Sequence, residues 1–100
     1  MRYHPDCKFC QIIDNPNTSL VHEDEHVVCV IGKYRQGYKE TYLIITKYGH
    51  YSQDELPQEE WDYMVGAGYA LGEARVWGTG EKYEVIEGQN DHASIEVGFR

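Results

Sequence analysis

The segment DHASIEVGFR, residues 91–100, alternates apolar and polar positions with a period of two. Residues 93, 95, 97 and 99 are apolar, and the positions between them are polar or glycine. This alternation is typical of a strand with one face in the core. The opposite face then presents His92, Ser94 and Glu96 in a row, about 6–7 Å apart by strand geometry. The segment therefore predicts a sheet and offers one row of polar groups where chemistry could take place.

Three further segments read as strands. Leu20–Glu23 and Val27–Ile31 are short apolar stretches around an acidic turn, which is the pattern of a hairpin. Thr41–Thr46 is rich in β-branched and aromatic residues and is predicted to be a central strand. Lys82–Glu87 is predicted to be a strand that a tight connection joins to the last one, His92–Phe99.

One long helix is predicted between these strands. Ser52 and Asp54 offer capping side chains, Pro57 suits a first turn, and Gly78-Thr79-Gly80 is expected to end the helix. Residues at helical spacing form the expected buried stripe: Trp61, Met64, Val65, Gly68, Leu71 and Gly72. The glycines weaken the helix, which indicates close packing against a sheet or a second subunit. We expect one α+β domain over residues 1–100 with an antiparallel sheet.

Composition limits the possible functions. The 100 residues carry a formal net charge of −8, which argues against a general nucleic-acid binder or a binder of anionic membranes. A small anionic ligand held by local donors remains possible, for example near Lys33, Arg35, Lys39 and Lys47. No apolar run reaches the length of a membrane span, and the first residues lack a signal-peptide segment. We therefore expect a soluble, cytoplasmic protein.

Cys7-Lys8-Phe9-Cys10 is a Cys-x-x-Cys motif, which is half of a tetrahedral zinc site. A redox pair usually lies in a thioredoxin-like context, which is absent here, and two unligated thiols are the simplest alternative. Cys29 lies in an apolar run and is expected to be buried. The second half of a zinc site would have to come from among the histidines: His4, His22, His26, His50 and His92.

Four segments resemble the histidine triad (HIT) family in the family's order, over nearly the whole chain. The Cys-x-x-Cys motif with the following Ile12-Ile13 resembles the start of many members, and Leu43–His50 resembles the strand and Lys-rich turn that lead to a histidine. Asp54–Glu60 resembles the next loop and helix start, and Asp91–Val97 resembles the terminal His-x-His-x-His strand. The resemblance implies an α+β meander with an antiparallel sheet, one long helix, and a dimer.

Family members are nucleotide-binding hydrolases and transferases that act at an α-phosphate. In members with a Cys-x-x-Cys, the resemblance implies zinc bound by the residues that match Cys7, Cys10, His50 and His92 here. That set has no open position, so the zinc would be structural. Lys47, Gln89, Asn90 and Ser94 are the candidate ligand-binding residues.

The resemblance also implies altered catalytic positions. Ser94 stands where the family has its nucleophilic histidine, and Glu96 stands where the family has a histidine that contacts phosphate. We therefore expect a non-catalytic domain that binds a nucleotide, another small anion or a protein. A divergent nucleotide hydrolase that uses Ser94 and Glu96, or another residue, is the alternative. In the simplest alternative, both side chains are only solvated on the outer face of the strand.

Overall fold

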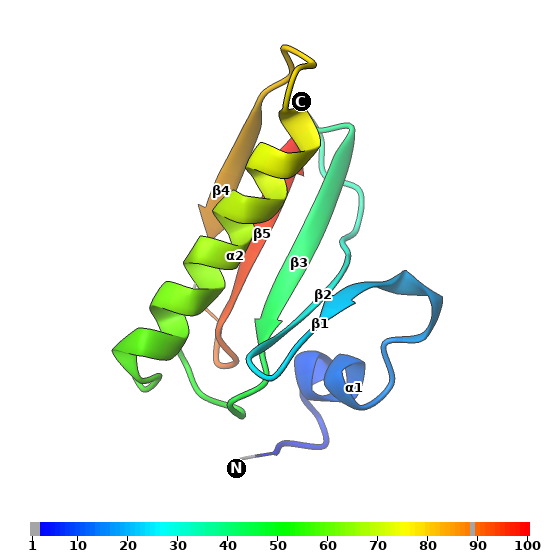
Figure 1. Ribbon diagram of the computed structural model, residues 1–100. Coiled ribbons are helices and arrows are strands. Elements are labelled where there is room, and N and C mark those ends of the chain that lie inside the picture. The colour runs from blue at the N-terminus through cyan, green and yellow to red at the C-terminus, as the bar shows by residue number, and fades with distance from the viewer. Residues whose placement is uncertain (1–2, 89) are drawn as a thin grey trace.

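The computed structural model describes residues 3–88 and 90–100 (Figure 1). The segments predicted as strands form strands within one or two residues of the expected bounds. The elements in chain order are α1 (Lys8–Asp14), a 3₁₀ turn (Asn17–Ser19), β1 (Leu20–Glu23), β2 (Val27–Ile31), β3 (Glu40–Thr46), α2 (Gln58–Val76), β4 (Tyr83–Glu87) and β5 (Ser94–Phe99).

The five strands form one antiparallel sheet in the order β1-β2-β3-β5-β4. The sheet confirms the predicted α+β class, the hairpin of β1 and β2, and the central place of β3. Figure 1 shows α2 crossing one face of the sheet, and its contacts are with β3, β4 and β5. No helix among the described residues is both long enough and apolar enough to cross a membrane.

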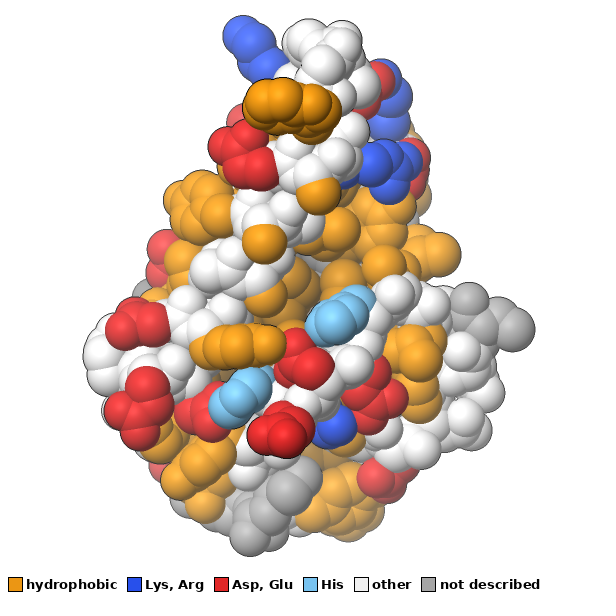
Figure 2. Space-filling view, in the orientation of Figure 1, with side chains coloured by type: hydrophobic (Ala, Val, Ile, Leu, Met, Phe, Trp, Pro, Cys, Tyr) orange, Lys and Arg blue, Asp and Glu red, His pale blue; other side chains and the backbone are white. Residues whose placement is uncertain are grey.

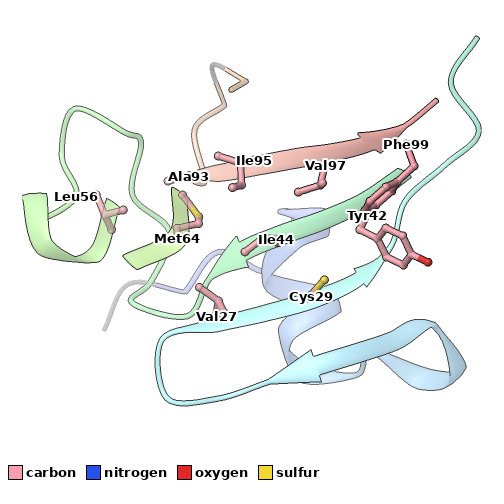
Figure 3. Packing of buried hydrophobic residues seen from close by; sticks show 10 residues of the cluster. All are labelled: Val27, Cys29, Tyr42, Ile44, Leu56, Met64, Ala93, Ile95, Val97 and Phe99. Atoms are coloured by element: carbon pink, nitrogen blue, oxygen red, sulfur yellow. The ribbon is translucent and has the colours of Figure 1, made fainter. Parts of the chain in front are cut away.

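The main core lies between α2 and the sheet (Figure 3). Ile44 and Ile95 are directly paired across β3 and β5, and both are buried. Cys29 is buried in the same layer, as predicted. The cluster consists of Val27, Cys29, Tyr42, Ile44, Leu56, Met64, Ala93, Ile95, Val97 and Phe99. The apolar side of β5 thus faces the helix, as its period of two predicts.

The glycines of α2 divide into two kinds. A Cβ at Gly68 would lie 2.6 Å from Cδ1 of Ile95, and a Cβ at Gly72 would overlap the ring of Tyr83. These two glycines allow the helix to approach the sheet, which confirms the predicted close packing. Gly66 has no neighbouring atom within 4 Å of a Cβ, although a helical glycine costs about 1 kcal/mol relative to alanine.

The predicted capping of α2 is wrong. Its N-cap residue is Pro57, which has an extended backbone, and no side chain caps the helix. Ser52 instead belongs to a separate turn, in which its backbone N–H donates to the Glu55 carboxylate at 3.0 Å. The predicted stop is correct, because α2 ends at Val76 and Gly78 follows with a φ of 73°.

The other face of the sheet is also covered over part of its area. Val28, Ile45 and Ser94 pair across neighbouring strands on this face, and their exposed fractions are 0%, 0% and 2%. Figure 3 shows α1 behind the sheet, on the side away from the labelled core residues. The alternative that Ser94 is merely solvated on an outer face is therefore wrong.

Candidate metal centre

Four potential ligands converge from three separate parts of the chain. Cys7 immediately precedes α1, and Cys10 lies in the first turn of that helix. His50 lies between β3 and α2, directly after Gly49, which has a φ of 149° that favours glycine. His92 lies just before β5 rather than within it, contrary to the predicted bounds of the last strand. The residues are brought together by the fold and not by sequence proximity.

The ligand atoms lie at distances expected around one ion. Nδ1 of His92 is 3.3 Å from Sγ of Cys10 and 3.6 Å from Sγ of Cys7, and Nδ1 of His50 is 3.9 Å from Sγ of Cys10. All four atoms lie within 4.8 Å of one another. Tetrahedral zinc, with its usual bond lengths, separates sulfur and nitrogen ligands by about 3.6 Å. The donor set therefore fits a tetrahedral metal ion.

A backbone carbonyl fixes the tautomer of His92. Its Nε2 lies 2.9 Å from the carbonyl oxygen of Thr46, which can only accept, so Nε2 carries the proton and Nδ1 keeps its lone pair. His92 is 2% exposed, and burial lowers its pKa, which favours the neutral ring. A neutral imidazole held by its second nitrogen is the usual form of a metal-binding histidine.

Burial shifts the pKa of the Cys10 thiol in the opposite direction. It raises the pKa of Cys10, so the protein alone disfavours the thiolate at this position. A bound divalent cation stabilises the thiolate and offsets this cost. Four protein ligands leave no open position, so such a site would tie the N-terminal segment to the sheet without supplying a reactive metal-bound water.

Two backbone hydrogen bonds hold the histidine segments in register. The N–H of Thr46 donates to the carbonyl of Ala93 at 3.2 Å, and the N–H of Ala93 donates to the carbonyl of Tyr51 at 2.7 Å. The end of β3, the turn that contains His50 and the start of β5 thus form one connected unit. The two candidate ligands on the sheet side are positioned by these bonds independently of any ion.

The remaining histidines lie elsewhere. His22 contacts Asp24 at 3.0 Å, and His26 contacts Glu60 at 3.1 Å. The exposed ring of His4 stacks on the ring of His50 with centroids 5.0 Å apart, outside the four-residue group. Five histidines were candidates for the second half of the metal site. Within the described part of the chain, two of them, His50 and His92, join the cysteines.

Ser94 and Glu96, which the resemblance places at the second and third triad positions, contact polar side chains outside the metal group. Nδ2 of Asn90 donates a hydrogen bond to Oγ of Ser94 at 3.2 Å. Oε1 of Glu96 lies 2.9 Å from Nη1 of Arg35, which belongs to the connection between β2 and β3. The Arg35–Glu96 pair was not predicted, and a separation of 61 residues offers no local sequence signal. Gln89, a predicted ligand-binding residue, lies outside the described residues.

The positively charged side chains that could hold an anion pair with carboxylates at separate places. Nζ of Lys47 contacts Glu23 and the carbonyl oxygen of Asp24, both at 2.8 Å, while Lys39 pairs with Glu81. Together with the Arg35–Glu96 pair, these contacts direct three positive charges to three different partners. A ligand-binding role for Lys47 stays a prediction.

Comparisons with solved structures identify the fold. The chain resembles a HIT family protein from Bacillus anthracis (TM-score 0.70, 23% identity, 96% of this chain and 74% of that one). It also resembles a histidine triad protein from Clostridium difficile (TM-score 0.69, 21% identity, 97% and 92%) and a hypothetical protein from Leishmania major (TM-score 0.71, 20% identity, 95% and 73%). No protein-family model matches the sequence, and no curated protein matches it. The chain therefore has the histidine triad fold.

Proposed function

We propose that this chain is a zinc-stabilised HIT-fold domain that acts by binding a partner and does not hydrolyse nucleotides. The observation that carries this proposal is Ser94, which takes the place of the family's nucleophile and is 2% exposed. A serine nucleophile needs an adjacent general base and access to its substrate. The hydrogen bond that Ser94 Oγ receives comes from the amide of Asn90, which is not a base.

The environment of Glu96 supports a protein partner over a nucleotide. Its carboxylate stands where the resemblance places a phosphate contact, and it forms an ion pair with Arg35. A phosphate at this position would meet a like charge and would compete for Arg35. An uncharged protein surface meets neither obstacle.

Nucleotide binding is a second candidate because one pocket offers donors. A pocket of about 390 Å³ borders the metal centre, and its lining includes His4, Lys8, Phe9 and Asn90. An aromatic ring and a lysine are suited to a base and a phosphate. Asp6 and Asp91 line the same pocket and weaken its attraction for anions.

We further propose that zinc is the bound metal and that the protein is located in a reducing compartment. Two thiolates and two imidazoles are a zinc donor set, and all three cysteines are free of disulfides. Free thiols are typical of a reducing compartment, which supports the cytoplasm as the location.

The decisive experiment measures turnover and binding on the same zinc-loaded protein. We expect no hydrolysis of adenosine phosphoramidate or diadenosine polyphosphates, and no thermal shift with a panel of nucleotides. Turnover that Ser94→Ala abolishes, and that the control Ser52→Ala retains, would establish the divergent hydrolase instead. A thermal shift without turnover would keep the non-catalytic proposal and assign a nucleotide as the ligand.

A further inference from the structure

A groove with an apolar lining lies between α2 and the hairpin of β1 and β2. Its volume is about 580 Å³, and small-molecule sites usually measure about 300–1,000 Å³. Figure 2 shows apolar side chains in this hollow, with acidic groups and two histidines at its lower end. The groove lies on the opposite face of the sheet from Ser94. Its role is therefore independent of the proposed function.

The groove exists because α2 covers only part of the sheet. The helix packs on β3, β4 and β5, so residues of β2 remain at its side, and Val27 and Cys29 form part of the groove lining. The helix contributes Gly66, Ala67 and Ala70, whose side chains are too small to fill the space. A Cβ at Gly66 would meet no described atom within 4 Å. An apolar molecule could therefore lie on β2 without displacing the helix.

Three polar side chains of the lining are joined to one another. The hydroxyl of Tyr63 donates to the carboxylate of Asp24 at 2.6 Å, and Nε2 of His22 lies 3.0 Å from the same carboxylate. These contacts connect α2 to the turn between β1 and β2. The groove therefore has a fixed polar end, defined by Tyr63, Asp24 and His22, beside an apolar floor.

Negative charge surrounds this polar end. The hydrogen bond to Asp24 raises the pKa of Tyr63, and the negative charges of Asp24, Glu25 and Glu60 raise it further. Three carboxylates thus act on one hydroxyl at the end of the groove. The side chains of Asp24 and Glu60 are only 25% and 18% exposed, so water screens their charges less than it screens those of a fully exposed carboxylate.

The nearby positive groups do not balance these charges. The ammonium of Lys47 pairs with Glu23, so that pair is neutral as a whole. His22 contacts Asp24 and His26 contacts Glu60, and both rings are uncharged unless they are protonated. With neutral histidines, the three carboxylates that act on Tyr63 leave a formal charge of −3 at the polar end.

From the apolar floor and the acidic end we infer that the groove binds a small organic cation. The apolar body of the ligand lies on β2, and its protonated amine lies beside Tyr63 and Asp24. The ring of Tyr63, which is 41% exposed, adds a cation–π contact. An anion would be repelled at this end, and a neutral apolar molecule would leave the carboxylates without a counter-charge.

The length of the groove favours a small molecule over a segment of another protein. The part of α2 that lines it runs from Tyr63 to Leu71, which is about 12 Å of helix. A docked protein helix would find an apolar surface only about two turns long. Polar groups placed at one end also match a ligand with a single charged head.

Three ligands that share one apolar chain and differ in their head group test this inference. Octylammonium, 1-octanol and octanoate have a positive, a neutral and a negative head at slightly alkaline pH. Each is titrated into the zinc-loaded protein at low salt and below its micelle concentration, and NMR chemical shifts give Kd. We expect octylammonium to bind about tenfold more tightly than 1-octanol, and octanoate to bind most weakly. Added salt is expected to reduce these differences.

Two pairs of matched variants locate the binding. Ala70→Leu fills the groove and is expected to abolish the octylammonium shifts, whereas Ala74→Leu adds the same side chain at an exposed position of α2 outside the groove and is expected to bind normally. Glu25→Gln removes one charge at the polar end and is expected to weaken octylammonium about threefold without affecting 1-octanol. Glu87→Gln on β4, at the other edge of the sheet from β1, is its control. Circular dichroism checks that all four variants keep the fold.

Several outcomes would overturn the inference. The absence of saturable octylammonium binding does so, as does equal binding of the three ligands or binding that Ala70→Leu retains. An amphipathic peptide of leucine and lysine that binds where octylammonium does not would assign the groove to a protein segment instead. Nucleotide turnover would contradict the proposed function alone, because the groove and Ser94 lie on opposite faces of the sheet.

Discussion

Nε2 of His92 donates a hydrogen bond to the carbonyl oxygen of Thr46 across 2.9 Å, in a site where both residues are buried. This bond joins the end of β3 to the start of β5 and directs the other ring nitrogen toward Cys7 and Cys10. The histidine is therefore oriented before any metal binds. An ion at this site would then join the N-terminal segment that carries the two cysteines to a histidine that is already oriented.

The first prediction concerns metal content. We expect one zinc per chain, and we expect a chelator to lower the melting temperature. In zinc-finger peptides, apparent zinc binding contributes about 10–16 kcal/mol of folding free energy. A loss of only about 3 kcal/mol here would lower Tm by roughly 12–24 °C in a domain of this size. Elemental analysis and thermal unfolding with and without chelator measure both effects.

Matched cysteine variants separate a metal effect from a general effect of thiol removal. Cys10→Ser is expected to lose zinc and the response to chelator. Cys29→Ser changes an equally buried thiol outside the site and is expected to keep both. Retention of stoichiometric zinc by Cys10→Ser would contradict the assigned ligand set.

The sequence predicted the parts of the fold that local patterns determine. The alternation in residues 93–99 identifies the core face of β5, and the order of the resembling segments identifies the four residues that converge in the candidate metal site. It did not predict that Ser94 would be buried, because alternation separates the two faces of a strand without indicating what covers the second face. The Arg35–Glu96 pair depends on how the connection between β2 and β3 lies relative to β5, which no nearby residue specifies. The capping of α2 was predicted wrongly because Ser52 belongs to a local turn with Glu55 and does not cap the helix.

A second prediction concerns the turn between β1 and β2. The carboxylate of Asp24 accepts the backbone N–H groups of His26 and Val27 at 2.7 and 3.0 Å, and the hydroxyl of Tyr63 at 2.6 Å. Partial burial alone would raise the pKa of Asp24, but these hydrogen bonds and that with His22 outweigh it and hold the pKa well below its usual range. We expect Asp24→Asn to cost about 1–3 kcal/mol at neutral pH.

The pH dependence of that difference follows from the sign of the shift. A depressed folded-state pKa stabilises the protein above the unfolded-state pKa, about 3.9, and this stabilisation is lost as the pH falls from there toward the folded-state value. The stability gap between wild type and Asp24→Asn is expected to narrow over that acidic range in urea unfolding. Asp54→Asn, at an exposed position, is the control and is expected to show no such gap.

A third prediction compares two glycines of α2. Gly72→Ala would force the new Cβ into the ring of Tyr83, so we expect a loss of about 1–3 kcal/mol from overpacking. Gly66→Ala meets open space and is expected to stabilise the chain by about 1 kcal/mol through helix propensity. Urea unfolding measures both effects. Equal effects of the two substitutions would contradict the different packing of these positions.

The last prediction concerns Ser94, which stands at the position that matches the family's nucleophilic histidine in the resemblance. Ser94 is 2% exposed and lies beside Ile45, which is fully buried, so the space around it is closed to a larger side chain. We expect Ser94→His to destabilise the chain by about 1–3 kcal/mol through overpacking and to leave it without phosphoramidate hydrolysis. Ser94→Ala is the matched control and is expected to stay close to wild type, because exposed Asn90 can exchange its hydrogen bond for water. If Ser94→His instead kept wild-type stability and hydrolysed the substrate, the site would be open, and the proposed lack of activity would rest on one side chain. Unfolding curves and product analysis of the same preparations distinguish the two outcomes, because a destabilised but folded protein can still be assayed below its transition.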